Sequence, residues 1–422
     1  MKSIQDINLK YLCTGCGACA AVCPTGAIKM KIHNGVYRPE IDQKLCIGCG
    51  RCLSVCPGIG VATEFIPKTK HYKKNHFLGS FISTYLGYSK NESIRFNSSS
   101  GGIATALLVF MIKNHYIDGA VVTRIKKGTY ETESFIAKNE EELISAQGSK
   151  YSPTNPVSII KKVKNMKGKK FAFVGLPCHI HGIRKIQKIE KWAQNRIILT
   201  IGLFCSHGSS YIATKTILEK LGRKNSINNL KYRGNGWPGK MEIGYKDKKE
   251  FIPLGVYWKR FYAPYFFTPY RCLTCCDFAS ELADISLGDA WLEEIKKRDN
   301  IGTSVIITRS RLAEKVIKDA EEANKIYLKP IPYSKVIKSQ SGILLRKKVG
   351  VGSRIKLFKL LHRPTPNYNH NYGFTCEGIL GALLVLFNVL VSKTFLGKFL
   401  IKNLPKTIIN RYCNIVYKLS SR

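Results

Sequence analysis

The chain has 422 residues, a length that predicts two or three domains, and 44% of them are hydrophobic, which excludes a disordered or low-complexity protein. Its 68 Lys and Arg residues outnumber 28 Asp and Glu residues, so the formal charge at pH 7 is +40. Most of these cations are single Lys residues scattered among Ile and Asn, without the aromatic and Arg clusters of a nucleic-acid groove. We therefore expect a diffusely basic surface and no nucleic-acid partner.

Cysteine is concentrated at the start of the chain, where eight of the 15 cysteines lie within the first 56 residues. Such density is typical of a disulfide scaffold only in a short secreted chain. Residues 1–12 contain no apolar segment of the kind that a signal peptide needs. We therefore expect thiolates bound to metal in a reducing cytoplasm.

These eight cysteines form two runs with the same spacing, C-x2-C-x2-C-x3-C-P. This is the spacing of bacterial ferredoxins with two [4Fe–4S] clusters, in which the fourth cysteine of each run binds the other cluster. Zinc is disfavoured because its sites pair C-x2-C elements instead of repeating four-cysteine runs. Residues 1–66 are thus predicted to form an α+β ferredoxin-like module. The expected ligands are Cys13, Cys16, Cys19 and Cys56 for one cluster, and Cys46, Cys49, Cys52 and Cys23 for the other.

A polar, basic stretch over residues 67–80 is predicted to link this module to the rest of the chain. Beyond it, short β-rich runs alternate with helical ones, a pattern that predicts an α/β domain over residues 81–345. Little can be predicted for the turn-rich, aromatic stretch 233–270. Strands are expected at 81–88, 119–125, 170–174 and 196–203, and helices at 101–115, 156–166 and 209–221.

Four further cysteines stand near predicted turns or strand ends. Cys178, in FVGLPCH, follows a strand and begins a helix, and Cys205, in IGLFCSH, follows another strand. Each alone is more typical of a buried small hydrophobe than of a ligand. Cys272 and Cys275, in RCLTCCD, have the C-x2-C spacing that both zinc and iron–sulfur sites use. Together the four could bind a third cluster.

Two loops have the character of ligand-binding segments. Residues 98–102 (SSSGG) precede an apolar helix, so their hydroxyl and N–H groups could face an anion, although an ordinary helix cap fits the spacing as well. Residues 148–151 (GSKY) offer a cation and an aromatic ring for a phosphate and a ring system, the alternative being an exposed turn. A formal dinucleotide fingerprint at residues 234–239 is rejected because it contains Pro238 and precedes a predicted strand at 240–245.

Residues 346–422 are predicted to form a basic, partly apolar helical tail. Its segment 378–392 is uncharged for fifteen residues, which is short of the roughly 20 that a transmembrane helix needs. A buried or interfacial helix is therefore favoured. The Lys and Arg residues that follow leave two alternatives, a helix packed on the core and a helix resting on an anionic membrane face.

Taken in order, the motifs SSSGG, QGSKY, VGLPCH, FCSHG, RGNGW, RCLTC and ADISLGD resemble the β-subunit family of coenzyme F420-reducing hydrogenases and dehydrogenases. The similarity runs from about residue 79 to residue 333. It implies an α/β flavoprotein core that binds FAD and one [4Fe–4S] cluster and exchanges hydride with an 8-hydroxy-5-deazaflavin. The implied cluster ligands are Cys178, Cys205, Cys272 and Cys275, with Cys276 as an alternative to the last. The implied FAD contacts are Ser99, Ser100, Gly101, Gly102, Gly148, Ser149, Lys150 and Tyr151.

The resemblance implies an iron–sulfur flavoprotein oxidoreductase in which a flavin converts the two electrons of a hydride into single electrons for the clusters. Its expected partners are a small-molecule hydride donor or acceptor, with coenzyme F420 as the leading candidate, and ferredoxin or another redox protein. The alternatives are a ferredoxin-dependent reductase of another small molecule, for example in surface-polysaccharide synthesis, and a non-catalytic electron-transfer subunit. No catalytic residue is assigned, and for Asp284 and Asp289 of ADISLGD a structural turn is favoured. The expected location is the cytoplasm, at the inner face of the membrane if the tail binds there.

Overall fold

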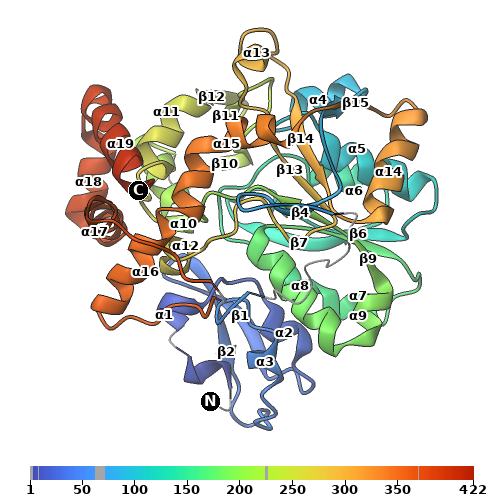
Figure 1. Cartoon of the computed structure of the whole chain (residues 1–422), viewed down its shortest axis with the longest axis horizontal. Coiled ribbons are helices and arrows are strands. Elements are labelled where there is room, and N and C mark those ends of the chain that lie inside the picture. Colours follow the sequence, from blue (N-terminus) through green and yellow to red (C-terminus); the bar gives the residue numbers. More distant parts are fainter. Residues whose placement is uncertain (1–2, 8, 62–71, 224–226, 369) are drawn as a thin grey trace.

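The computed structural model describes residues 3–7, 9–61, 72–223, 227–368 and 370–422. Figure 1 shows an N-terminal ferredoxin-type module at the bottom, a central domain built on a mixed sheet, and C-terminal helices at the left. The predicted order of an iron–sulfur module, an α/β domain and a helical tail is confirmed at this level.

The ferredoxin-type module consists of a β-hairpin and short helices. The hairpin turns at Asn34 and Gly35, whose φ angles of 51° and 74° suit a two-residue hairpin turn. Its core combines the cysteines with apolar side chains such as Ile4, Leu12 and Ile28. The elements are η1 (Ile4–Asp6), α1 (Leu9–Leu12), α2 (Ala18–Val22), β1 (Ile28–His33), β2 (Val36–Ile41) and α3 (Arg51–Ser54).

The central domain is organised around an eight-stranded sheet with the order β15-β5-β14-β13-β9-β8-β6-β7. The four adjacent strands β13, β9, β8 and β6 are parallel, and every neighbouring pair beyond them is antiparallel. The carboxyl ends of β8 and β9 therefore meet at one edge, where open α/β sheets bind their ligands. The strands are β5 (Ser83–Ser89), β6 (Gly119–Ile125), β7 (Thr132–Ala137), β8 (Phe171–Gly175), β9 (Ile197–Leu203), β13 (Ile285–Asp289), β14 (Ser304–Thr308) and β15 (Ile326–Pro330).

Helices cover both faces of this sheet. On one face α5 and α14 bury side chains such as Leu107 and Ile317, and on the other α7, α8 and α9 bury Ile160 and Ile183. The second face also receives α2, so the ferredoxin-type module packs directly on the central domain. The helices of this part are α4 (Glu92–Asn97), α5 (Ile103–Lys113), α6 (Glu140–Ser145), η3 (Pro156–Ile159), α7 (Ile160–Lys164), α8 (Pro177–Ile189), α9 (Lys191–Arg196), α10 (Tyr211–Lys220) and α14 (Arg311–Glu322).

The stretch 233–270, which sequence patterns left open, contributes β11 and β12 to a small three-stranded sheet with the order β10-β11-β12. Strand β11 confirms the strand predicted over 240–245, so the glycines before it do not open a helix and the rejection of a dinucleotide fingerprint is confirmed. The elements are β10 (Ile227–Lys231), β11 (Lys240–Tyr245), β12 (Lys248–Pro253), α11 (Leu254–Tyr257), the π-helical turn η4 (Trp258–Tyr262), α12 (Tyr270–Leu273) and α13 (Glu293–Lys296).

Five helices complete the chain, and the tail predicted over 346–422 begins inside the first of them. Helix α17 packs between α16 and α19, with Val385 and Val389 fully buried. Within the described residues no single helix is long and apolar enough to cross a membrane. Helices α17 and α18 have that length and composition only when taken together, and they are bent by 104° relative to each other. The helices are α15 (Tyr333–Lys348), α16 (Val351–Leu360), α17 (Cys376–Val391), α18 (Phe395–Asn403) and α19 (Lys406–Ser420).

The predicted linker, residues 67–80, is only partly visible because residues 67–71 lie outside the described part of the chain. Its remainder includes β3 (Lys73–Asn75) and leads into β4 (Gly79–Phe81), which pair as an antiparallel hairpin. Leu78 and Phe81 of this segment are buried in a cluster with β5 and β14. The segment is thus packed on the central domain.

Candidate iron–sulfur site

The first cysteine set, Cys13, Cys16, Cys19 and Cys56, lies in the interior of the ferredoxin-type module, and all four side chains are buried. Burial, together with the neighbouring thiols of Cys56 and Cys13, raises the pKa of the Cys16 thiol to about 12. The four sulfur atoms are therefore close enough to interact although they come from α2 and from the loops after α1 and α3. Thiolates gathered in so apolar a place need a positive group among them, which an iron–sulfur cluster would supply.

The second set, Cys46, Cys49, Cys52 and Cys23, lies nearer the surface. Cys49 is exposed and Cys46 half-buried, whereas the other two are buried. The apolar side chain between the first two, Ile47, is 68% exposed. Gly48 and Gly50 have φ angles of 66° and 70°, a left-handed conformation that lets the loop bend tightly between the cysteines. A cluster held by this set would have one edge open to a soluble redox partner.

The third set, Cys178, Cys205, Cys272 and Cys275, is assembled by the sheet. Cys178 begins α8 directly after β8, and Cys205 follows the adjacent parallel strand β9. Helix α12 brings the C-x2-C pair to the same edge, and all four cysteines line one cavity together with Cys276. The fold thus brings together the four cysteines for which the resemblance implies a cluster.

The polar surroundings of the third set are cationic. Burial raises the pKa of Cys205 to about 12, and the buried ammonium group of Lys347 opposes this rise. For Cys275 the same ammonium and the guanidinium of Arg271 outweigh burial, so its pKa lies below the ordinary value. The N–H of Gly208 also donates a hydrogen bond to Sγ of Cys272 at 3.3 Å. Buried cations and an amide donor suit a cubane bound by four thiolates, which carries net negative charge.

The first and third sets are neighbours across the interface between the module and the central domain. The Cys16 thiol contributes to the raised pKa of Cys178, after burial. In α8, a Cβ at Gly182 would lie 3.2 Å from Cβ of Ala18 and 3.8 Å from Sγ of Cys16, so glycine allows the two helices to approach. The three sets therefore form a series from the exposed rim of the module to the interior of the central domain.

Among the described residues, no three His, Cys, Asp or Glu side chains converge as they would around a single metal ion.

The two loops with ligand-binding character are also brought together. The N–H of Ser149 donates to Oγ of Ser99 at 2.7 Å, and Nε2 of Gln147 donates to Oγ of Ser98 at 2.7 Å. A Cβ at Gly148 would lie 3.4 Å from the carbonyl oxygen of Arg233, so RGNGW lies beside the same loops. None of the eight residues implied to contact FAD lines the cysteine cavity.

The other implied FAD residues make these contacts. Ser100 donates to the carbonyl of Thr303 at 2.9 Å, and the N–H of Gly101 donates to Ser304 at 2.9 Å, which ties the loop to β14. Gly102 caps α5. Nζ of Lys150 donates to the carbonyls of Gln147 and Gly148 at 3.2 and 2.8 Å, and burial lowers its pKa to about 7. The Tyr151 ring packs 5.0–6.5 Å, between centroids, from the rings of Tyr232, Tyr257, Trp258 and Tyr262.

Family comparisons match most of the chain. The family model for the N-terminal part of the coenzyme F420 hydrogenase/dehydrogenase beta subunit matches residues 84–161, and the model for its C-terminal part matches residues 168–333. A 4Fe-4S dicluster domain matches residues 12–58. The chain belongs to the coenzyme F420 hydrogenase/dehydrogenase β-subunit family. It is an oxidoreductase of that family with an N-terminal 4Fe–4S dicluster domain.

The relatives of this β-subunit family protein are similar at moderate identity. The coenzyme F420 hydrogenase subunit beta of Methanothermobacter thermautotrophicus is 28% identical over 298 residues, which are 68% of this chain and 99% of that protein. The coenzyme F420-dependent sulfite reductase of Methanocaldococcus jannaschii is 28% identical over 334 residues, 76% of this chain, but the match spans only 47% of that protein. The coenzyme F420 hydrogenase subunit beta of Methanosarcina barkeri is 25% identical over 297 residues, 66% of this chain and 97% of that protein.

The fold of the family is also found in a solved complex. A chain of the F420-reducing [NiFe] hydrogenase complex from Methanosarcina barkeri superposes with a TM-score of 0.55 at 20% identity, covering 70% of this chain and 99% of that one. This likeness establishes the fold of the central part of the chain. The sequence-based identification of the family is confirmed by the family matches.

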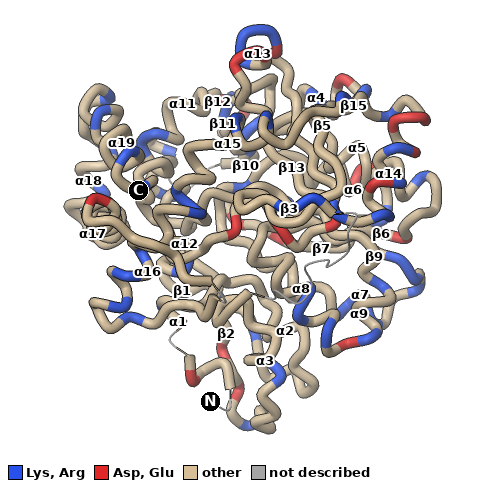
Figure 2. Tube along the Cα trace, in the orientation of Figure 1, with Lys and Arg blue, Asp and Glu red and all other residues tan. Residues whose placement is uncertain are grey.

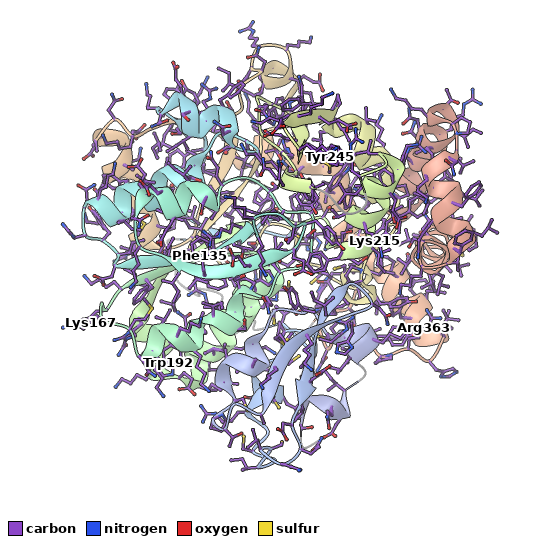
Figure 3. The ribbon with its side chains drawn as sticks, turned by 180° about the vertical axis from the view of Figure 1, so that it is seen from behind. Phe135, Lys167, Trp192, Lys215, Tyr245 and Arg363 are labelled. Carbon is purple, nitrogen blue, oxygen red and sulfur yellow. The ribbon has the colours of Figure 1, made fainter. Side chains whose placement is uncertain are left out.

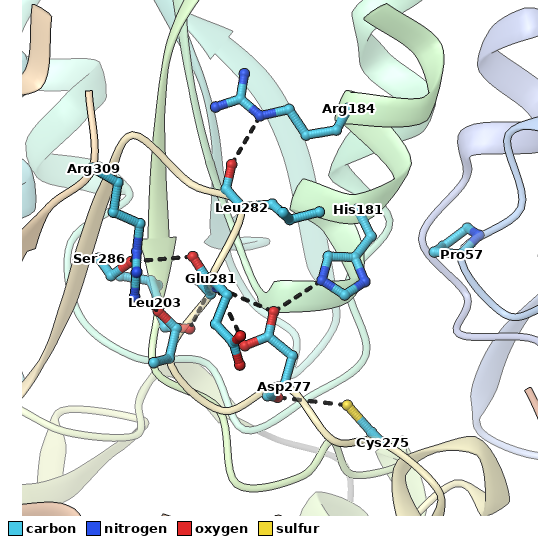
Figure 4. A network of polar contacts seen from close by, with 12 residues as sticks. Pro57, His181, Arg184, Leu203, Cys275, Asp277, Glu281, Leu282, Ser286 and Arg309 are labelled. Atoms are coloured by element: carbon cyan, nitrogen blue, oxygen red, sulfur yellow. Dashed lines mark hydrogen bonds and ion pairs between the residues drawn. The ribbon is translucent and has the colours of Figure 1, made fainter. Parts of the chain in front are cut away.

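Sequence patterns did not reveal the polar groups that hold the third cysteine set of this family member (Figure 4). Nε2 of His181, on α8, lies 2.9 Å from Oδ2 of Asp277, and the N–H of Glu281 donates to the same oxygen at 3.2 Å. Burial raises the pKa of Asp277, but the hydrogen bond from His181 and the nearby cations Lys348 and Arg309 together outweigh burial and keep that pKa below its usual range. Sγ of Cys275 lies 3.6 Å from the Asp277 carbonyl. Lys347 was also missed, because one Lys among so many cations carries no sequence signal.

The two acidic residues of ADISLGD bind arginines from other elements. Oδ2 of Asp284 accepts hydrogen bonds from Arg184 at 3.0 Å and from the N–H of Thr200 at 2.8 Å. Asp289 accepts two bonds of 2.9 Å from the buried guanidinium of Arg233. A structural turn was favoured for both residues, whereas Asp284 directly precedes β13 and Asp289 ends it; the second contact anchors the RGNGW loop beside QGSKY.

Limited oxidation is expected to remove about four iron atoms per chain from the ferredoxin-type module first, because Cys49 is exposed and Cys46 half-buried while the first set is buried. The measurement is the iron content of the reconstituted protein during titration with ferricyanide, followed by electron paramagnetic resonance. Simultaneous loss of all iron would contradict the assignment of an exposed outer cluster. So would a titration in which the paramagnetic signal that is absent from a Cys49→Ser variant is not the first to disappear from the wild type.

Proposed function

We propose that this protein is an iron–sulfur flavoprotein oxidoreductase that passes electrons between a hydride-exchanging small molecule and one-electron carriers, with reduced coenzyme F420 as the leading candidate for the small molecule. The observation that carries the proposal is the series of three cysteine sets. It runs from the exposed rim at Cys49 through the buried set around Cys16 to the set around Cys178. Electrons that travel singly need such a series.

The residues of the third set fit a [4Fe–4S] cluster. Cys178, Cys205, Cys272 and Cys275 would hold it, and Lys347 would offset its negative charge. Cys276 lines the same cavity, but Cys275 is favoured as the ligand because its thiol is among the groups that raise the pKa of the Cys178 and Cys205 thiols. Cys276 also interacts with Lys348 and Tyr372.

The loops at the start of α5 fit the anionic part of FAD. Gly102, with a φ angle of 76°, caps the helix without any side-chain acceptor, so the first amide N–H groups of α5 are available to a phosphate. Ser99 and Gly102 would lie at that phosphate with Ser149 beside them, while Ser100 and Gly101 hold the loop on β14. When bound, FAD supplies the chemistry of taking up two electrons as hydride and releasing them one at a time. This chain's own residues bind and orient it.

The test uses protein that is purified anaerobically and reconstituted with iron, sulfide and FAD. Flavin is expected to remain after gel filtration, to bleach on addition of reduced F420, and to be accompanied by about twelve iron atoms per chain. A preparation without flavin would overturn the proposal. Bleaching by reduced ferredoxin but not by reduced F420 would mean that the substrate is another small molecule. A ferredoxin-dependent reductase of such a molecule is the second candidate function, because the exposed rim at Cys49 could pass electrons in either direction.

A further inference from the structure

The tail helices expose large apolar side chains to solvent. Phe395 and Leu396, which begin α18, are 87% and 65% exposed, and Phe399 one turn later is 52% exposed. Helix α17 presents a matching stripe at intervals of three and four residues, formed by Leu380, Leu383 and Phe387. We call these six residues the tail face. An apolar surface of this kind on a folded protein marks a binding site.

The opposite side of α17 is held by the protein. Val385 and Val389 are fully buried between α16 and α19, and Nδ2 of Asn388 donates to the carbonyl of Pro264 at 2.8 Å. The N–H of Phe267 donates to Oγ of Ser392 at the end of the helix at 2.9 Å. Moving α17 into a membrane as a span would break this packing. The tail face is therefore a surface of the folded protein, and Figure 3 shows the tail helices, in faded red, at one edge of the molecule.

The charges around the tail face are almost all positive. From Cys376 to Arg422 the chain contains seven Lys and Arg residues and a single acidic residue, Glu377. That glutamate is ion-paired with Arg422. Lys406 and Arg411 are exposed, and Figure 2 shows basic segments on α18 and α19. The surface is thus apolar with a basic margin.

This combination identifies the occupant. Interfacial membrane helices carry Phe and Leu on one face and Lys or Arg on the margin, and they bind anionic lipid through both. Protein interfaces, in contrast, are depleted of Lys. We propose that the tail face binds peripherally to an anionic lipid bilayer.

Such binding would bring the third cysteine set close to the membrane. Tyr270 and Leu273 of α12, the helix that carries Cys272, pack in one cluster with Val385 of α17. Nζ of Lys393, between α17 and α18, lies 4.0 Å from the centroid of the Tyr270 ring. The helix that rests on lipid is therefore in direct contact with the helix that carries the first cysteine of the C-x2-C pair.

The test is flotation of the full-length reconstituted protein with vesicles of phosphatidylcholine alone or with about 30% phosphatidylglycerol. The protein is expected to float with the anionic vesicles only, and less at high salt. The double variant Phe395→Ser/Phe399→Ser is expected to lower the bound fraction at least about tenfold, because two large apolar side chains no longer enter the lipid. The matched control is Phe251→Ser on β12, where the side chain is 46% exposed, and it is expected to float like the wild type.

Each other outcome overturns the proposal. Equal flotation of the double variant and the wild type would show that the tail face does not contact lipid. Absence of flotation with both kinds of vesicle would do the same. A concentration-dependent dimer in gel filtration that the double variant abolishes, without flotation of the wild type, would assign the tail face to a second copy of the chain.

Discussion

Replacing Cys275, a proposed ligand of the third cluster, by alanine is expected to lower the iron content of the reconstituted protein from about twelve to about eight atoms per chain, because one cubane holds four. Both ferredoxin clusters should remain, since their cysteines lie in a separate module with its own core. Reduction of those clusters by the small-molecule hydride donor should then fall by at least about a hundredfold, because the series of one-electron sites is interrupted. The measurements are iron analysis and electron paramagnetic resonance.

The neighbouring cysteine provides the control. Cys276→Ala removes a thiol of the same size that interacts with Lys348 and Tyr372. It is expected to keep about twelve iron atoms and the normal rate of cluster reduction. If Cys276→Ala loses iron and Cys275→Ala does not, the ligand assignment is reversed, and if neither loses iron, the third cluster is absent.

The ferredoxin cysteines could be predicted because their pattern is local. Ligands two or three residues apart lie in one loop and one short helix, so spacing alone places them around a cubane. The third set is different. Cys178 and Cys205 meet only because β8 and β9 are adjacent parallel strands, and α12 must fold back to add the last pair. The third set was therefore predicted from the order of motifs along the chain, because the spacing between its cysteines does not indicate that they meet.

Tertiary contacts explain what sequence patterns missed. Lys347 sits on α15, far along the chain from the cysteines it faces, and its burial is a property of the fold. Strand β6 was predicted at its observed bounds because it is a clear apolar run. The helix expected over 156–166 is divided in the structure. A 3-10 turn begins at Pro156, and the short α7 that follows it ends at Lys164, before Met166. The polar, basic sequence before residue 80 gave no sign of the β3–β4 hairpin.

The ion pair between Arg233 and Asp289 is expected to contribute more to stability than any surface pair. The Arg233 guanidinium is buried and donates two 2.9 Å hydrogen bonds to the Asp289 carboxylate. Nε1 of Trp237 donates a third hydrogen bond to the same carboxylate at 2.8 Å. Asp289→Ala leaves a buried cation without its partner, which should lower the free energy of unfolding by about 3–5 kcal/mol. The measurement is the midpoint of urea unfolding under anaerobic conditions, at constant slope.

Two variants make this result specific. Asp289→Asn keeps the shape and one acceptor oxygen, so it is expected to lose less stability than Asp289→Ala. Glu133→Ala removes the partner of the half-exposed Arg124, a surface pair, and should cost at most about 1 kcal/mol. Equal midpoints for Asp289→Ala and Glu133→Ala would mean that the buried pair does not hold RGNGW beside QGSKY. The expected order instead makes Asp289 the residue that fixes the geometry of the proposed flavin loops.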